Sequence, residues 1–157
     1  MLKPITLKEL SNAENVEIIG DKIYIVIPPD WIVLGETRLS YTTILRIVEC
    51  SREHHWNIDI LSRAKTPLDS ITRCLECEFF TPILVGSKVI IRYAVIGHRR
   101  KSYKIRFEIV DEIRNKVCAT IKMISVFYDP AENISVEPPT AVSEFLQKTL
   151  TTEISND

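Results

Sequence analysis

The stretch GETRLSYTTILRIVECSREHHW, from Gly35 to Trp56, decides the fold because it predicts the one long helix of the chain. Ser40 is expected to be its N-cap, since a serine hydroxyl can accept a hydrogen bond from the first turn. Apolar residues cover most of its circumference: Leu39, Ile44, Leu45, Ile47 and Val48. Polar residues at spacings of four, three and four form one narrow stripe: Thr42, Arg46, Glu49 and Glu53. A helix that is apolar on most sides must be covered, most simply by a sheet.

The rest of the chain predicts strands. Two short β-like runs before the helix, Asn15–Ile19 and Lys22–Ile27, are separated by a Gly-Asp turn. After a loop, Ser62–Ser70, four more strands are expected: Ile71–Phe80, Lys88–Ile96, Tyr103–Val110 and Val117–Tyr128. Their short connections favour an antiparallel meander. The tail is expected to hold one short helix, from Ala141 to Leu150.

This order of elements indicates an α+β fold, in which a curved antiparallel sheet wraps around one long central helix. At 157 residues, a single domain is the simplest organisation. We expect an N-terminal extension over residues 1–14, the folded domain over residues 15–130, and a C-terminal tail over residues 131–157.

Composition excludes several classes of function. The net charge of −1 gives no general attraction to nucleic acid or to an anionic membrane. No apolar run is long enough to span a bilayer, and the first residues lack the pattern of a secretory signal, so a cytoplasmic location is expected. Four cysteines are too few for a disulfide framework. Cys74 and Cys77 lie three apart on an expected strand and point to opposite faces, so we expect no metal site.

Specific residues in this order resemble the hotdog fold of the acyl-thioester hydrolases, over roughly residues 24–129. The likeness is best to the 4-hydroxybenzoyl-CoA and acyl-ACP thioesterase branches. The family's central helix commonly reads apolar-Arg-x-x-Glu, here Leu45, Arg46 and Glu49. The strand half matches at Pro82, Gly86-Ser87, Ser102, Phe107-Glu108-Ile109 and Asp111-Glu112.

One departure concerns the usual catalytic acid. Many family members carry an Asp before the helix, then a Gly-His pair and an Asn near the helix start. Here those positions hold Leu34, Thr37-Arg38 and Tyr41. Other hotdog branches use a Glu on the central helix, or an Arg/Asn pair without an acid, so the resemblance still permits catalysis.

Thioester hydrolysis needs a carboxylate, donors for the oxyanion and cationic contacts for the acyl carrier. The exposed N–H groups at the helix start, from Tyr41, Thr42 and Thr43, are the natural oxyanion donors. For the acid there are two candidates, Glu49 and Glu36.

Both candidate acids also have a purely structural interpretation. Glu49 can form an ion pair with Arg46 or Arg52, and Glu36 can be a solvated loop acid. Arg38 and Arg46 are candidates to polarise the thioester carbonyl in an acid-free mechanism.

The densest group of cations is HRRK, from His98 to Lys101. By the resemblance, Arg99, Arg100, Lys101 and the following Ser102 would bind the phosphates of CoA or the acidic surface of an acyl carrier protein. The alternative is a solvated hairpin tip. One basic patch without interleaved aromatics is too small a footprint for nucleic acid.

The resulting hypothesis is hydrolysis of an acyl-CoA or acyl-carrier-protein thioester, at a site on a dimer interface. The protein would need no cofactor beyond the CoA or phosphopantetheine of its substrate. A homodimer is expected, or a tetramer, because a lone curved sheet leaves an unpaired edge. The alternatives are a non-catalytic acyl-CoA or acyl-carrier binding protein, favoured by Leu34, and a hotdog dehydratase acting on an acyl thioester.

Overall fold

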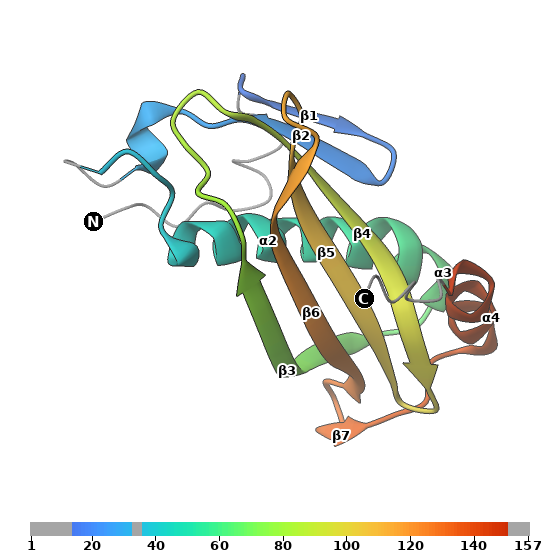
Figure 1. Cartoon of the computed structure of the whole chain (residues 1–157). Helices are drawn as coiled ribbons and strands as arrows, with labels where there is room; N and C mark the ends of the chain where they lie inside the picture. The colour runs from blue at the N-terminus through green and yellow to red at the C-terminus, as the bar shows by residue number, and fades with distance from the viewer. Residues whose placement is uncertain (1–13, 33–35, 151–157) are drawn as a thin grey trace, which may run out of the picture. The chain divides into compact units, whose positions relative to one another are not determined.

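A computed structural model describes residues 14–32 and 36–150 of the chain (Figure 1). The strands are β1 (Val16–Ile19), β2 (Lys22–Val26), β3 (Asp69–Phe79), β4 (Lys88–Arg99), β5 (Ser102–Asp111), β6 (Lys116–Asp129) and β7 (Ile134–Ser135). The helical segments are η1 (Pro29–Trp31), α2 (Tyr41–His55), η2 (Trp56–Leu61), α3 (Ser62–Ala64) and α4 (Thr140–Thr149). One long helix and an antiparallel sheet therefore make up the fold, as the sequence predicts.

The sheet order is β1-β2-β4-β5-β6-β3, with β7 paired to the far end of β6. The expectation of a four-strand meander was wrong for β3, which neighbours β6 and not β4. The reason lies in the connection from Phe80 to Ser87. It does not form a hairpin, because the amides of Phe80 and Thr81 both donate to the carbonyl of Cys118 on β6. In place of β3, β2 pairs with β4, with Ile23 opposite Ile91.

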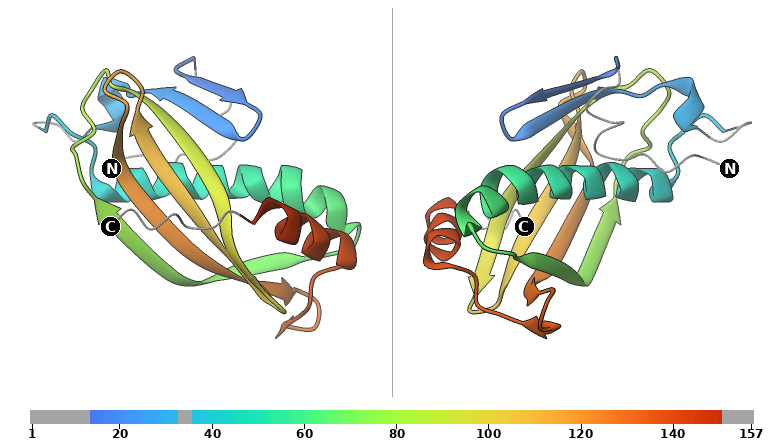
Figure 2. Two further views of the ribbon diagram at one scale, coloured as in Figure 1. Left: turned by 45° about the vertical axis from the view of Figure 1, so that its right-hand side comes forward. Right: turned by 180° about the vertical axis from the view of Figure 1, so that it is seen from behind.

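The described residues form two compact units. The first draws on residues 14–32, 36–55, 77–92 and 107–120, and the second on residues 56–76, 93–106 and 121–150. In the first, α2 lies along the strand segments of its unit (Figure 2). Its core consists of side chains at most 6% exposed: Ile23, Ile25, Ile44, Ile47, Val48, Val89, Ile91, Phe107, Ile109 and Ala119.

The core of the second unit is built on aromatic rings. Phe127 stacks on Tyr103 with ring centroids 5.3 Å apart, and Trp56 lies 6.1 Å from Phe127. Offset ring pairs of this kind add stability beyond the area that they bury. Tyr103 and Phe127 are at most 1% exposed.

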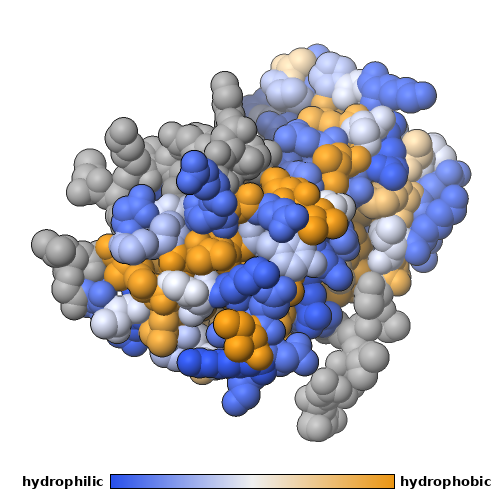
Figure 3. Space-filling view, turned by 90° about the horizontal axis from the view of Figure 1, so that it is seen from above, coloured by the Kyte–Doolittle hydropathy of each residue, from blue (hydrophilic) through white to orange (hydrophobic). Residues whose placement is uncertain are grey.

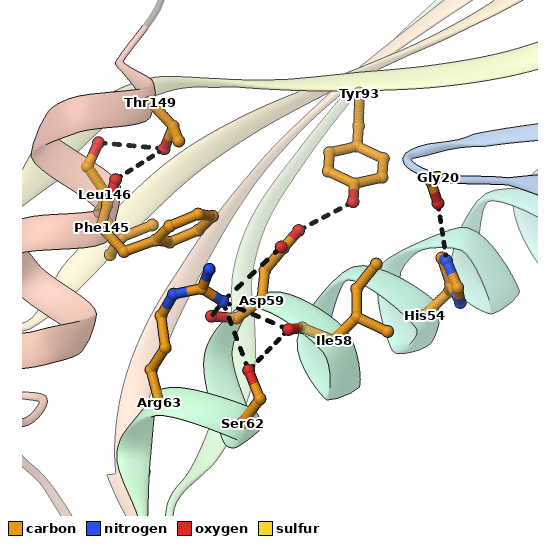
Figure 4. Close-up of polar contacts among 10 residues, drawn as sticks. All are labelled: Gly20, His54, Ile58, Asp59, Ser62, Arg63, Tyr93, Phe145, Leu146 and Thr149. Atoms are coloured by element: carbon orange, nitrogen blue, oxygen red, sulfur yellow. Dashed lines mark hydrogen bonds and ion pairs between the residues drawn. The ribbon is translucent and has the colours of Figure 1, made fainter.

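A polar network joins η2, α3, β4 and α4 (Figure 4). The hydroxyl of Tyr93 donates to Oδ2 of Asp59 at 2.8 Å, and the Arg63 guanidinium lies 3.8 Å from Oδ1 of the same carboxylate. The guanidinium also covers the Phe145 ring at 4.0 Å, a cation–π contact that holds α4 beside α3.

The start of α2 is capped by Ser40, as the sequence predicts. Oγ of Ser40 accepts the Thr43 amide at 3.2 Å, and the Ser40 carbonyl accepts the Ile44 amide at 3.1 Å. The hydroxyls of Thr42 and Thr43 also lie within 3.0 Å of the serine oxygen. Ser40 is therefore the N-cap of the long helix.

The end of this helix differs from the prediction. Helical structure continues from Tyr41 through η2, a π-helical segment, to Ala64, so Ser62–Ala64 is helix and not the expected loop. No glycine or proline interrupts this run, and the helix stops only where Lys65 takes a left-handed conformation with φ of 56°. The tail helix α4 lies close to its predicted range.

The polar stripe of α2 is exposed along its whole length, at Thr42, Arg46, Glu49 and Glu53. The opposite side of the helix is buried. The polar stripe that the spacing identified is therefore the exposed face of the helix.

Elsewhere on the surface, large apolar side chains are exposed on β1 and β3 and in the β5–β6 turn. Ile19 is 55% exposed, Ile71 53% and Ile113 83%. On the face seen in Figure 3, apolar and hydrophilic residues are interspersed. Within the described residues, no helix is both long enough and apolar enough to cross a membrane.

We predict that Ser40→Ala lowers the free energy of unfolding by about 1 kcal/mol, because the Thr43 amide loses its cap. Urea unfolding followed by circular dichroism measures this loss. The matched control is Ser62→Ala, which removes an exposed hydroxyl bonded to the Ile58 carbonyl and is expected to change stability by less than about 0.5 kcal/mol. Equal losses in both variants would contradict the capping role of Ser40.

Candidate functional site

A pocket of about 520 Å³ lies at the start of α2, and we call it the acyl pocket. Its apolar wall comes from Leu39, Ile44, Phe79, Phe80, Pro82 and Ile83. Its polar groups come from Glu36, Arg38, Ser40, Tyr41 and Thr81. A mostly apolar concavity with a few convergent polar groups is the usual form of a small-molecule site.

Two chain segments build this pocket and are bonded to each other. The Leu39 amide donates to the Ile83 carbonyl at 2.8 Å, and the Val85 amide donates to the Thr37 carbonyl at 3.4 Å. Arg38 and Leu84 face each other in an isolated antiparallel bridge. The segment before the helix is therefore fixed to the loop after β3, which brings Glu36 and Arg38 to the pocket.

The helix start supplies fewer free donors than expected. Thr43 is 4% exposed and its amide donates to Ser40, so it cannot serve an oxyanion. In the described part of the chain, the amides of Tyr41 and Thr42 have no such partner. Tyr41 lines the pocket and Thr42 does not. The positive end of the helix dipole is thus presented to the pocket mainly at Tyr41.

The two candidate acids lie in different surroundings. Glu36 is an exposed carboxylate that lines the acyl pocket together with Arg38. Glu49 lies on the exposed stripe and is paired with Arg52, whose Nη2 is 2.6 Å from Oε1 and whose Nε reaches both carboxylate oxygens. Arg46, also on the stripe, has no ion pair within the described residues. The structure therefore brings together Glu36, Arg38 and Tyr41, and leaves Glu49 and Arg46 outside the pocket.

The family's usual catalytic Asp position corresponds to Leu34 in this chain. Leu34 lies outside the described residues, as does Gly35. After this gap, the described residues resume at Glu36 and continue into α2.

A second pocket, of about 570 Å³, lies in the second unit, and we call it the basic pocket. Residues of β3, β4, β5 and β6 line it: Arg73, Cys74, Gly97, His98, Arg99, Ser102, Tyr103, Lys104 and Ile124. It contains three cations and no carboxylate. Such a concavity attracts anions.

The residues of the HRRK cluster lie in two different surroundings. Arg99 and Ser102 line the basic pocket. Arg100 instead pairs with Glu137 at 2.5 Å, and Nζ of Lys101 donates to the Ser135 carbonyl at 2.8 Å. Two of the four residues expected to bind phosphates are therefore engaged by the segment around β7.

Several lining residues were missed by the sequence analysis. Phe79 and Phe80 follow each other at the end of β3, and they are 47% and 56% exposed. Two consecutive phenylalanines break the alternation of apolar and polar residues that a half-buried strand shows. This break in the sequence was the available signal for an apolar surface at the end of β3. Arg73 carries no local signal, because the sheet brings it to the same pocket as Arg99 from a distant part of the chain. Lys104 is close to Arg99 in sequence, on the next strand, but lies outside the HRRK cluster.

None of the four cysteines, all of which lie in the described residues, forms a disulfide, and they differ in exposure. Cys74 is exposed in the wall of the basic pocket, Cys77 is half-buried, and Cys50 and Cys118 are buried. Burial raises the pKa of the Cys118 thiol. Over residues 14–32 and 36–150, no three His, Cys, Asp or Glu side chains are grouped to hold a metal ion.

Comparison with known proteins identifies the family of this chain. Residues 37–148 match the family model described as the Thioesterase-like superfamily. The chain belongs to this superfamily. A search of curated proteins finds no match.

Solved structures of the hotdog fold resemble the chain at low sequence identity. The YbaW probable thioesterase of Escherichia coli aligns with a TM-score of 0.69 and 13% identity, over 83% of this chain and 98% of that one. A hypothetical protein of Staphylococcus aureus, solved in complex with CoA, gives 0.71 and 11%, over 90% and 91%. The 1,4-dihydroxy-2-naphthoyl-CoA thioesterase of Synechocystis gives 0.66 and 11%, over 80% and 94%. The fold is therefore the expected curled antiparallel sheet with one long helix.

We predict that one thiol of the native protein reacts fast with a thiol reagent at pH 8, and that this thiol is Cys74. Cys118 is expected to react far more slowly, because burial blocks access and its raised pKa lowers the thiolate fraction at that pH. Timed labelling followed by peptide mass spectrometry measures the order in which the cysteines react. Removal of the fast phase by Cys118→Ser rather than Cys74→Ser would contradict it.

Proposed function

We propose that the protein hydrolyses an acyl thioester, with the reacting carbonyl at the start of α2. The observation that carries this proposal is the acyl pocket, where an apolar wall, the Glu36 carboxylate, the Arg38 cation and the first turn of the helix meet. Membership of the Thioesterase-like superfamily supports the same reaction. The cytoplasm remains the expected location.

In the proposed reaction, water attacks the thioester carbonyl and the carrier thiolate leaves. Glu36 takes the proton from the attacking water as general base and passes it to the leaving sulfur. The amide of Tyr41, at the positive end of the helix dipole, stabilises the negative oxygen that develops on the carbonyl. Arg38 adds a cation on the same side of the pocket.

The wall of the acyl pocket supports an apolar acyl group. Leu39, Ile44 and Ile83 are at most 6% exposed, so they present a firm apolar surface. Phe79 and Phe80 remain about half exposed and would lose contact with water when an acyl chain binds. The pocket of about 520 Å³ suits an acyl group of moderate size.

We propose a homodimer formed along β3, or a tetramer built from two such dimers. This strand has eleven residues and, among the strands of the described residues, lies at the end of the sheet order with a neighbour on one side only. Its apolar residues Ile71 and Leu75 are 53% and 44% exposed. A long, exposed and apolar edge favours pairing with a second copy of the same strand.

We predict that Glu36→Gln lowers kcat by about 100-fold or more, because the general base is lost. The measurement is thioester hydrolysis over a panel of acyl-CoAs and acyl carrier proteins. Glu49→Gln is the matched control, since it removes a carboxylate paired with Arg52 outside the pocket. It is expected to retain turnover.

The opposite result, turnover lost only in Glu49→Gln, would assign the acid to the stripe on α2 and refute the role of Glu36. Absence of turnover on every substrate, with acyl-CoA bound and intact after incubation, would refute hydrolysis. The protein would then be an acyl-CoA binding module.

We predict that Leu75→Lys shifts the protein from dimer to monomer, because charge on β3 opposes strand pairing. Light scattering coupled to size-exclusion chromatography measures the mass. Ile113→Lys is the control, since Ile113 is 83% exposed and belongs to the β5–β6 turn, not to β3. A dimer that persists in Leu75→Lys would rule out this edge as the interface.

A further inference from the structure

The basic pocket places a thiol among cations that no acid compensates. Cys74 lines it together with Arg73, Arg99 and Lys104, and its other lining residues include no Asp or Glu. Within the described residues, these three cations form no ion pair, whereas other cations of the same unit do pair with carboxylates. Like charges around one concavity repel each other, and an anion bound there relieves that repulsion.

Cys74 is open to a small molecule that enters this pocket. It is exposed, and the pocket has a volume of about 570 Å³, which suits a ligand the size of a short peptide. Gly97 lies in the wall, where a Cβ would lie 3.3 Å from Cβ of Lys104, so the missing side chain keeps the concavity open. Pairing of β3 with a second copy would use the backbone of the strand and leave the Cys74 side chain on a face of the sheet.

The pocket also holds a hydrogen-bonding atom without a partner. Nε2 of His98 is buried and, in the described part of the chain, makes no hydrogen bond. His98 lines the same concavity as the cations, and Ser102 adds a hydroxyl. A carboxylate accepts hydrogen bonds from a ring N–H, a hydroxyl, a guanidinium and an ammonium group. The lining therefore suits a ligand that carries carboxylates.

The other thiol of β3 has the opposite surroundings. Cys77 is half-buried, does not line the pocket and stands between Glu76 and Glu78 in the sequence. Cys74 instead follows Arg73 directly. Cations attract an anionic reagent and carboxylates repel it. An anionic reagent should therefore select Cys74 over Cys77.

We propose that Cys74 is a site of reversible modification by an anionic low-molecular-weight disulfide of the glutathione class. The thiol gives its proton to water, and the resulting thiolate attacks one sulfur of the disulfide. The S–S bond of the disulfide breaks as the new S–S bond to Cys74 forms, and the other half leaves as a thiolate that takes up a proton. The Cys74 sulfur is oxidised and the leaving sulfur is reduced, so no further oxidant is needed. A reducing thiol reverses the exchange.

The cations of the basic pocket act on this exchange in two ways. Arg73, Arg99 and Lys104 attract the carboxylates of the disulfide and raise its concentration around Cys74. They also stabilise the negative charge on the leaving sulfur. The modification needs neither a thioester nor turnover, so its test is independent of the proposed hydrolysis.

The test compares two disulfides on the full chain at pH 8: glutathione disulfide, which is anionic, and hydroxyethyl disulfide, which is neutral. Timed reaction followed by peptide mass spectrometry measures the rates at Cys74 and Cys77. Glutathione disulfide is expected to modify Cys74 and to leave Cys77 as a thiol over the same time. Added salt should slow this reaction, because it screens the attraction, and should leave the rate of the neutral disulfide unchanged.

Variants of the cations separate pocket charge from general charge. Arg73→Gln and Lys104→Gln should each slow glutathione disulfide at Cys74 by about fivefold, because each removes one attracting charge from the pocket. Arg100→Gln and Lys101→Gln remove equal charge outside the pocket and should keep the rate within about twofold. With the neutral disulfide, all four variants should react like the original protein, which also shows that they are folded.

Equal rates at Cys77 and Cys74 with glutathione disulfide would overturn the proposal, as would a rate at Cys74 that salt does not change. Equal slowing in all four variants would also contradict it, because net charge rather than the pocket would then attract the reagent. The same holds for slowing that extends to the neutral disulfide, since access would then set the rate. No reaction of Cys74 with glutathione disulfide would refute the site outright.

Discussion

The acyl pocket depends on how the start of α2 is held. The helix is capped within the chain by Ser40, and the residues just before it are bonded to the loop after β3 through Leu39 and Ile83. The cap uses the Ser40 side chain, whereas the second contact joins two backbone groups, and both lie close to the pocket. Together they fix the direction of the first helical turn and place Arg38 beside the apolar wall. If either contact were lost, the carboxylate, the cation and the helix dipole would no longer converge.

The sequence predicted the parts of the fold that depend on short-range periodicity. Ser40 as the cap, the exposed stripe through Arg46 and Glu49, and the strand ranges all follow from local spacing. It could not place β3 next to β6, because that pairing depends on hydrogen bonds from Phe80 and Thr81 to Cys118, far along the chain. It also missed the helical turn at Ser62–Ala64, where polar residues resemble a loop although none of them breaks a helix.

The candidate site was less predictable than the fold. Glu49 had two arginines at equivalent spacing, and the sequence had no means to choose Arg52 over Arg46. The cluster HRRK is contiguous in sequence, yet the hairpin directs Arg99 to one pocket while Arg100 turns to Glu137. Adjacent residues on a strand end point in different directions, so charge density along the chain is a poor guide to charge density in space.

The π-helical segment η2 has a consequence for the register of the long helix. Trp56, Ile60 and Ala64 are all buried, although they are spaced four apart. In a regular α-helix, residues four apart advance by about 40° beyond a full turn, so Ala64 would point about 80° away from Trp56. The wider turn of η2 holds more residues per turn and cancels that advance. Deleting a single residue there would rotate Ala64 and Arg63 about the helix axis, and it would take the guanidinium away from Phe145 even though no contact residue had changed.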